Sequence, residues 1–446
     1  MWPAPGPREH LRDVVCLGCG CACDDIEAVV ADGRILEARN ACALGSAWFG
    51  DGGAPSRALV AGRPATLDEA IARAARVLSD SSRPVVYLAP DISCETQREA
   101  AAIADALRGA LDSVTSDTAG AAMLASQERG RPTATLGEIR HRADVIVFWG
   151  VDPADRYPRF SSRYAPDCEG RHVPGGRRAR TVVSVDLGRA RGAADADLRV
   201  AVPPEDEVAV LTALAALVEE RASAAAPSDP PNRDREAAAP GTRPGRIELA
   251  WSLARRLAPT LAAGRYVALV ADGEPPPATP DARRAAALIG LADALNGPTR
   301  CALMILRAGG NRSGADWVLT AQTGYPMAVD FARGFPRYRP HDGTASARLR
   351  HGRADVVAVV GAVAALPAES TAAIARCRSI AVGPRASESP LAGGEVAIDT
   401  AVAGIHEPGT ALRMDEVPLP LRPVLAGPPP AADVVRALRA AIFQRR

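Results

Sequence analysis

The residues with the clearest capacity for chemistry are cysteines near the start of the chain. Nine cysteines are present, at positions 16, 19, 21, 23, 42, 94, 168, 301 and 377. Cys16, Cys19 and Cys23 have the spacing C-x2-C-x3-C, and Cys42 follows after eighteen intervening residues. Short loops that present three thiolates, closed by a distant fourth, suit a [4Fe-4S] cluster. A tetrahedral four-thiolate zinc site would use the same ligands, so the spacing leaves both metals open.

The segment around these cysteines predicts a compact metal lobe. Gly18 and Gly20 let the backbone fold around a cluster without Cβ clashes, and Cys21 is expected to point away from it. Asp32-Gly33 lies between two apolar segments, which predicts a type I′ hairpin. We therefore expect a metal site on a small β-meander. The four scattered cysteines after Cys42 are expected to be small buried hydrophobic residues.

The rest of the chain must supply the elements that position this site. Short apolar runs alternate with segments of helical periodicity, which is typical of an α/β fold with mostly parallel sheets. The expected strands are 85–89, 145–150, 181–186, 267–271, 301–306, 356–361 and 379–383. The expected helices are 67–79, 95–111, 205–221, 247–263, 281–295 and 433–443.

Composition divides the chain further. Residues 222–245 are rich in Pro, Ala and charge without apolar periodicity, which predicts a flexible linker or insertion. We expect a Cys-rich lobe at 1–55, an α/β lobe at 56–221 to which 326–420 contribute in part, and a second α/β lobe with the C-terminal segment at 246–446.

Charge and hydropathy exclude several classes of protein. The chain has 446 residues, with 53 cationic against 52 acidic side chains, which gives no reason to expect nucleic acid or an anionic membrane as partner. Every one of the 53 cations is arginine, which excludes lysine Schiff-base chemistry. No apolar run reaches the ~18–20 residues of a membrane helix, and no secretory signal is recognisable. We therefore expect a soluble cytoplasmic protein, in which reduced thiols favour a metal site over disulfides.

Several motifs together resemble one known family. Cys23 is followed by Asp24-Asp25-Ile26, and Cys42 is preceded by Asn40-Ala41. Further along lie Gln322-Thr-Gly-Tyr-Pro326, Ala328-Val-Asp-Phe331 and Arg333-Gly-Phe-Pro-Arg-Tyr338. These segments resemble the B subunit of formylmethanofuran dehydrogenase, a molybdopterin/tungstopterin oxidoreductase. The resemblance implies a small N-terminal Cys-rich β lobe and two doubly wound α/β lobes, without a C-terminal β-barrel domain.

The resemblance also locates a degenerate metal site. In the dehydrogenases a Cys or selenocysteine, followed by His and Gly, binds and flanks the tungsten or molybdenum. The matching residues here are Thr118, Ala119 and Gly120. A hydroxyl is a poor substitute for a thiolate on a soft, high-valent metal, and alanine can neither donate nor accept protons. Asp186 and Arg189 are a partial match to the Asp-Pro-Arg segment that helps to hold a pterin nucleotide.

The resemblance therefore implies a non-redox, structural B subunit of a formyltransferase/hydrolase complex in tetrahydromethanopterin-linked C1 metabolism. We expect a [4Fe-4S] cluster or its vestige on Cys16, Cys19, Cys23 and Cys42, and no tungsto- or molybdopterin. The implied partners are an amidohydrolase-like A subunit, a formyltransferase-like subunit, and a C-type subunit. Two alternatives stay open, namely a zinc-stabilised interaction protein and an active tungsten- or molybdenum-pterin dehydrogenase subunit.

Overall fold

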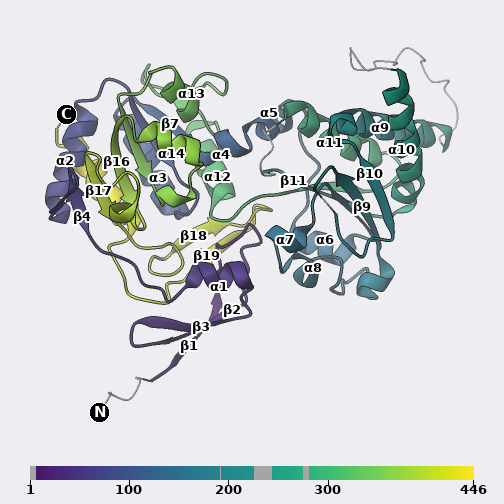
Figure 1. Ribbon diagram of the computed structural model, residues 1–446, viewed down its shortest axis with the longest axis horizontal. Coiled ribbons are helices and arrows are strands. Elements are labelled where there is room, and N and C mark those ends of the chain that lie inside the picture. Colours follow the sequence, from purple (N-terminus) through teal and green to yellow (C-terminus); the bar gives the residue numbers. More distant parts are fainter. Residues whose placement is uncertain (1–6, 191, 226–243, 275–280, 446) are drawn as a thin grey trace. The chain divides into compact units, whose positions relative to one another are not determined.

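The fold is described from a computed structural model, which describes residues 7–190, 192–225, 244–274 and 281–445. The chain divides into two compact units. Unit 1 comprises Met1–Gly120 and Ala308–Arg446, and unit 2 comprises Ala121–Arg307. Figure 1 labels their helices and strands.

The N-terminal part of unit 1 is a three-stranded antiparallel sheet. It consists of β1 (Glu9–Val14), β2 (Ile26–Ala31) and β3 (Arg34–Arg39), with β2 in the centre. Asp32 and Gly33 join β2 to β3 with φ of 50° and 71°, so the predicted type I′ hairpin is confirmed. Helix α1 (Ala43–Phe49) follows directly after Cys42.

Unit 1 is built around a nine-stranded sheet whose centre is parallel. The parallel strands, in spatial order, are β7 (Ala110–Ser113), β6 (Pro84–Leu88), β15 (Val356–Val360), β16 (Arg378–Gly383) and β17 (Val396–Asp399). Antiparallel strands complete both edges, β13 (Val329–Asp330) and β14 (Arg337–Tyr338) beside β7, and β4 (Ala58–Val60) and β5 (Arg63–Ala65) beside β17.

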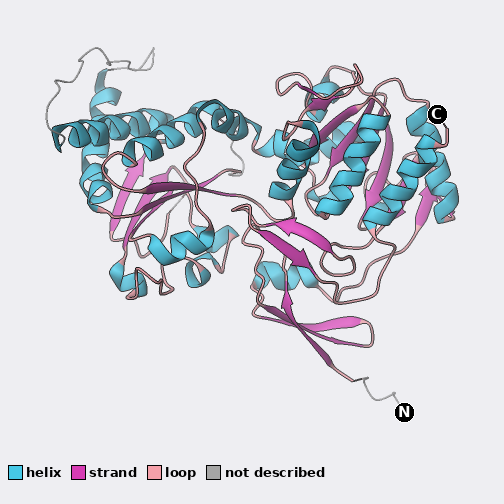
Figure 2. Ribbon diagram, turned by 180° about the vertical axis from the view of Figure 1, so that it is seen from behind, coloured by secondary structure: helices cyan, strands magenta, loops and turns pink. Residues whose placement is uncertain are grey.

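Helices cover both faces of this sheet, because its central strands are apolar on both sides. One face packs against α2 (Leu67–Ser79), α3 (Cys94–Ala106) and α15 (Ala431–Phe443), and Figure 2 shows these helices in front of the strands. The other face packs against α13 (Ala345–Arg350) and α14 (Ala368–Ile374). Helix α4 (Val114–Thr118) follows β7, and α12 (Arg312–Thr323) contacts α3, α4 and the hairpin of β18 (Gly409–Leu412) and β19 (Pro418–Leu421).

Unit 2 contains a five-stranded parallel sheet. Its spatial order is β10 (Leu198–Val202), β9 (Thr181–Leu187), β8 (Val145–Trp149), β11 (Val267–Asp272) and β12 (Cys301–Leu306). Its main core lies against α9 (Glu207–Ala225), α10 (Pro244–Ala263) and α11 (Ala282–Leu295). The remaining helices are α5 (Gly120–Arg129), α6 (Leu136–Arg142), α7 (Pro153–Arg156) and α8 (Phe160–Arg163). The predicted α/β class is thus confirmed.

The expected lobes, at 56–221 with part of 326–420 and at 246–446, stay a prediction. Strand β6 pairs with β15, from residues 326–420, in unit 1, and β8 pairs with β11, from residues 246–446, in unit 2. One expected helix differs from this structure. The helix expected at 95–111 ends at Ala106, and residues 110–113 form β7. Arg108 reverses the chain between them with φ of 53°. Of the expected linker at 222–245, residues 226–243 lie outside the described residues.

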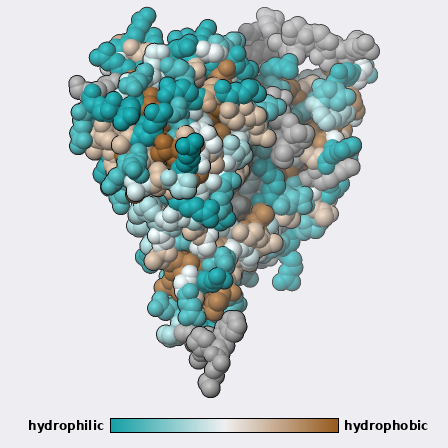
Figure 3. Space-filling model, turned by 60° about the vertical axis from the view of Figure 1, so that its left-hand side comes forward, coloured by the Kyte–Doolittle hydropathy of each residue, from teal (hydrophilic) through white to brown (hydrophobic). Residues whose placement is uncertain are grey.

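The surface carries only scattered apolar side chains in the described ranges. Six large ones are exposed, namely Leu36, Leu44, Leu249, Trp317, Phe335 and Phe443. On the face in Figure 3 the brown, apolar areas are small and lie among teal, hydrophilic ones. None of the described helices combines the length and apolar character that crossing a bilayer requires.

Candidate functional site

The loop of residues 16–23 joins β1 to β2 and brings its cysteines into a buried position. The amide of Cys16 donates to the carbonyl of Cys23 over 2.9 Å, and the amide of Ala22 donates to that of Cys19 over 3.1 Å. These bonds fold the loop back on itself. Cys16, Cys19 and Cys23 are at most 9% exposed, and Cys42 is half-buried at the start of α1. Cys21 is fully buried.

The other three predicted ligands lie close enough to Cys16 to affect its pKa. Burial raises the pKa of the Cys16 thiol to about 12, and the neighbouring thiols of Cys19, Cys23 and Cys42 raise it further, whereas the amide of Gly18 lowers it. Gly45 lies between two of these thiols, since a Cβ there would be 3.2 Å from Sγ of Cys16 and 4.0 Å from Sγ of Cys42. Thiolates are the donors that a [4Fe-4S] cluster uses, and Gly45 adds no side chain beside two of these sulfurs.

No group of three or more His, Cys, Asp or Glu side chains in the described ranges is arranged so that it could hold a metal ion. The four-cysteine site therefore stays a prediction.

Distant segments of unit 1 hold the cysteine loop from outside. The amide of Gly310 donates to the carbonyl of Leu17 over 2.9 Å, and the amide of Met414 donates to that of Gly20 over 3.1 Å. A Cβ at Gly309 would lie 2.7 Å from the carbonyl oxygen of Gly18, so only glycine allows this approach. The Gly-rich segment that follows β12 thus serves as a support for the cysteine loop.

Thr118 is the last residue of α4, and its hydroxyl is already engaged. It donates to the carbonyl of Val114 over 3.0 Å, and Nη1 of Arg312 lies 3.5 Å from Oγ1 of Thr118. Nε of Arg312 donates to the carbonyl of Gly309 over 3.2 Å. Arg312 therefore contacts both Thr118 and Gly309, the residue that packs on the cysteine loop. A threonine hydroxyl held in this way beside a cation does not fit the coordination of a soft metal.

The other two residues of the degenerate site offer no replacement ligand. Ala119 is buried and is the C-cap residue after α4, and Gly120 begins α5. A Cβ on Gly120 would make only ordinary contact with Met327, with Cε at 3.5 Å. The structure therefore keeps space beside this residue.

Asp186 lies near the end of β9 in unit 2, and its carboxylate is hydrogen-bonded to groups of the same unit. It accepts hydrogen bonds from Ser184 Oγ, the Gly192 amide and Arg199 Nη1, at 2.8 to 2.9 Å. Burial opposes its ionisation, but the bonds from Gly192, Arg199 and Ser184 prevail and lower the pKa of Asp186 to about 2. Arg189 is exposed on the loop after β9. The two residues expected to hold a nucleotide thus lie in different surroundings.

Ion pairs surround the carboxyl ends of the unit 2 strands where the strand order reverses, between β8 and β11. Such a reversal is the usual ligand crevice of a parallel α/β sheet. Arg156 pairs with Asp272, which ends β11, and donates to the carbonyl of Glu274 over 3.0 Å. Nε of Arg307 lies 3.2 Å from the Glu274 carboxylate. The arginines at this crevice are therefore held by carboxylates of the same unit.

Arg312 and Gly309 are the functional candidates that sequence reasoning missed. Arg312 lies 194 residues from Thr118 in the chain, so no local pattern connects the two. Gly309 and Gly310 pack on Leu17 and Gly18, which lie almost three hundred residues earlier in the chain, so this contact also has no local sequence signal.

The architecture defines a class of protein, namely a two-unit α/β protein with a cysteine-rich loop on an N-terminal β-meander. No model of a known protein family matches the sequence. The chain is 31% identical over 435 residues to the B subunit of the tungsten-containing formylmethanofuran dehydrogenase 2 of Methanocaldococcus jannaschii, with 94% of each chain covered. It is 29% identical over 441 residues to the protein of the same name from Methanococcus maripaludis, covering 94% of this chain and 95% of that one.

A solved structure shows the same fold. It is the formyltransferase/hydrolase complex of Methylorubrum extorquens with methylofuran, of which one chain aligns with a TM-score of 0.69 and 22% identity. The alignment covers 87% of this chain and 99% of that one. The chain belongs to the family of formylmethanofuran dehydrogenase B subunits, as the motifs in the sequence predicted.

Proposed function

We propose that the chain is the B subunit of a formyltransferase/hydrolase complex in tetrahydromethanopterin-linked C1 metabolism, and that it acts as a non-redox structural subunit. In such a complex a formyl group moves from tetrahydromethanopterin to a methanofuran-like carrier and is hydrolysed to formate on other subunits. The partners are an amidohydrolase-like, a formyltransferase-like and a C-type subunit. Family membership and the fold shared with a chain of the Methylorubrum complex support this assignment.

The observation that carries the non-redox role is the environment of Thr118. Its hydroxyl donates to Val114 and lies beside the guanidinium of Arg312, as described above. A metal at this position would meet a hydroxyl that is engaged with Val114, in place of a thiolate. This difference opposes binding of tungsten or molybdenum.

The names of the two curated relatives favour a second candidate, an active tungsten-pterin dehydrogenase subunit, because both are described as tungsten-containing. The two candidates differ in electron transfer. We expect the purified complex to show no reduction of a viologen dye by the formylated carrier, while formyl transfer from tetrahydromethanopterin proceeds. Viologen reduction that is coupled to the carrier would establish the dehydrogenase instead.

A double variant, Thr118→Cys with Ala119→His, sharpens this test. It restores the residue types that the dehydrogenases use, but leaves Arg312 in place. Unchanged formyl transfer in this variant supports a role for residues 118 and 119 outside the chemistry. Loss of formyl transfer, with the complex still assembled, would place the reaction at this site.

The cysteine loop is the second part of the proposal. We assign Cys16, Cys19, Cys23 and Cys42 as ligands of a [4Fe-4S] cluster that stabilises the N-terminal lobe. Anaerobic purification is expected to give a brown protein with broad visible absorption, and the Cys42→Ser variant is expected to lose both. Cys377→Ser is the matched control, because this half-buried thiol lies on another part of the chain. A colourless protein with stoichiometric zinc would establish the zinc-stabilised alternative.

A further inference from the structure

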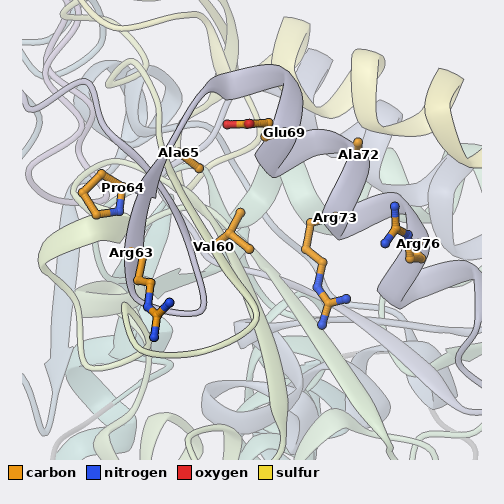
Figure 4. Close-up of a pocket in the computed structure, with 8 residues that line it drawn as sticks. All are labelled: Val60, Arg63, Pro64, Ala65, Glu69, Ala72, Arg73 and Arg76. Carbon is orange, nitrogen blue, oxygen red and sulfur yellow. The ribbon is translucent and has the colours of Figure 1, made fainter.

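A hollow separates the β4–β5 hairpin from helix α2, at the outer edge of the nine-stranded sheet of unit 1. Its volume is about 460 Å³. Figure 4 shows the residues that line it, with the guanidinium groups of Arg63 and Arg73 at the end away from Glu69. Arg63 extends from β5, whereas Arg73 and Arg76 lie one turn apart on α2. Apolar side chains make up most of the remaining lining, and these are Val60, Pro64, Ala65 and Ala72.

Both walls of the hollow are held in place by their own hydrogen bonds. Helix α2 begins with a capping box, in which the Thr66 hydroxyl accepts from the Glu69 amide and the Glu69 carboxylate accepts from the Thr66 amide over 2.9 Å. The hairpin turns through Ala61, whose amide donates to the carbonyl of Glu395 over 3.1 Å. The arginines thus project from a preformed frame, which lowers the entropy lost when a ligand binds.

The charges that line the hollow are not balanced. Arg73 lies 2.6 Å from Glu395, whose other oxygen lies 2.8 Å from Arg378. Glu69 is engaged with Thr66. In the part of the chain that the structure describes, neither Arg63 nor Arg76 forms an ion pair. Two guanidinium groups therefore remain uncompensated at one hollow, with a third beside them.

We propose that this hollow binds a phosphate-bearing small molecule, with the phosphate between Arg63, Arg73 and Arg76 and the organic part on Val60 and Pro64. A guanidinium offers parallel N–H donors that match phosphate oxygens. A phosphate can place its charge against two or three cations at once, whereas a single carboxylate has one charge and two oxygens. The site is independent of the proposed function, since it uses none of the residues of the cysteine loop or the Thr118 region.

The test uses inorganic pyrophosphate as the probe and the purified full chain in isothermal titration calorimetry at low salt. The Arg63→Gln/Arg76→Gln double variant removes the two uncompensated charges without leaving a buried carboxylate unpaired. We expect pyrophosphate to bind the wild-type chain with one site, and at least tenfold more weakly to the double variant. Arg422→Gln is the matched control, because Arg422 is also exposed in unit 1 and is expected to leave the affinity unchanged.

Three results would overturn the proposal. These are no saturable binding of pyrophosphate to the wild-type chain, equal affinity in wild type and double variant, and citrate binding as tightly as pyrophosphate. Citrate separates a phosphate site from a general site for carboxylates. Circular dichroism melting of each variant verifies that the substitutions leave the fold intact, which is expected because Arg63 and Arg76 are exposed.

Discussion

The carboxyl group of Asp112 in β7 holds together three segments of unit 1, and it is predicted to make stability depend on pH. It is fully buried and accepts hydrogen bonds from the Ala328 amide at 2.9 Å, the Ala345 amide at 2.6 Å and the Ser116 hydroxyl at 2.7 Å. Burial, together with the nearby Asp117 carboxylate, raises the pKa of Asp112 to about 6, although the hydrogen bonds lower it. The folded protein therefore binds this proton more tightly than the unfolded chain does.

The size of the effect follows from the two pKa values. The ordinary value is 3.8, so a folded-state value of about 6 corresponds to about 3 kcal/mol of unfolding free energy. Because the folded-state pKa is raised, this contribution is fully present below pH 3.8 and is lost as the pH rises to 6. The Asp112→Asn variant has a neutral side chain at every pH, so its free energy of unfolding does not include this decrease.

The assay is urea unfolding followed by circular dichroism, for wild type and Asp112→Asn, between pH 4 and pH 7. Other titrating groups cancel in the difference between the two proteins. We expect the free energy of unfolding of wild type to fall relative to the variant by about 2 kcal/mol over this range, because part of the full effect lies below pH 4. A free-energy difference between wild type and Asp112→Asn that does not change with pH would refute the reasoning.

Three further predictions concern other parts of the chain. Gly309→Ala places a Cβ 2.7 Å from the carbonyl oxygen of Gly18 and is expected to lower the free energy of unfolding by about 1–3 kcal/mol. Gly290→Ala is the control, because open space surrounds that position in α11, and it is expected to be neutral or stabilising. Thermal melting distinguishes the two variants. Asp186→Asn is expected to lower the free energy of unfolding by about 2 kcal/mol at pH 7. The lowered pKa of Asp186 gives stability that is present above pH 3.8 and is lost as the pH falls to about 2, so urea unfolding at pH 3 and pH 7 measures the effect. Thr66→Ala removes the capping box of α2 and is expected to lower the unfolding free energy by about 1 kcal/mol in the same assay, and an unchanged value would contradict the capping geometry.

Elements with strong local signals could be predicted from the sequence. The strand at Cys301–Leu306 and the helix at Leu67–Ser79 have the expected bounds, because the first is a continuous apolar run and the second has a cap, first-turn carboxylates and helical periodicity. Asp32-Gly33 was equally informative for the hairpin. In each case the residues that decide the structure are neighbours in the chain.

The missed features depend on contacts between distant residues. Strand β7 reads Ala-Leu-Asp-Ser, which has no strand pattern, and its position is set by pairing with β6 and by the bonds of Asp112 to Ala328 and Ala345. The division into two units follows from pairing between strands more than a hundred residues apart, which composition does not reveal.

The candidate site divides in the same way. The spacing of Cys16, Cys19 and Cys23 is a local pattern, and so it could be read directly. The contact of Arg312 with Thr118 and the support of the cysteine loop by Gly309 join segments almost two hundred or more residues apart. The sequence alone indicates only that a thiolate is missing at position 118. The contacts in the fold add that the Thr118 hydroxyl is hydrogen-bonded to Val114 and lies beside Arg312.

The central claim, that this chain belongs to the family of formylmethanofuran dehydrogenase B subunits without their metal chemistry, is tested most directly by elemental analysis of the anaerobically purified complex. The cells are grown with both tungstate and molybdate, and tungsten, molybdenum and iron are measured together by inductively coupled plasma mass spectrometry. The account predicts iron at about four atoms for each copy of this chain, as a [4Fe-4S] cluster requires, and only traces of tungsten and molybdenum. One tungsten or molybdenum atom for each copy would contradict it.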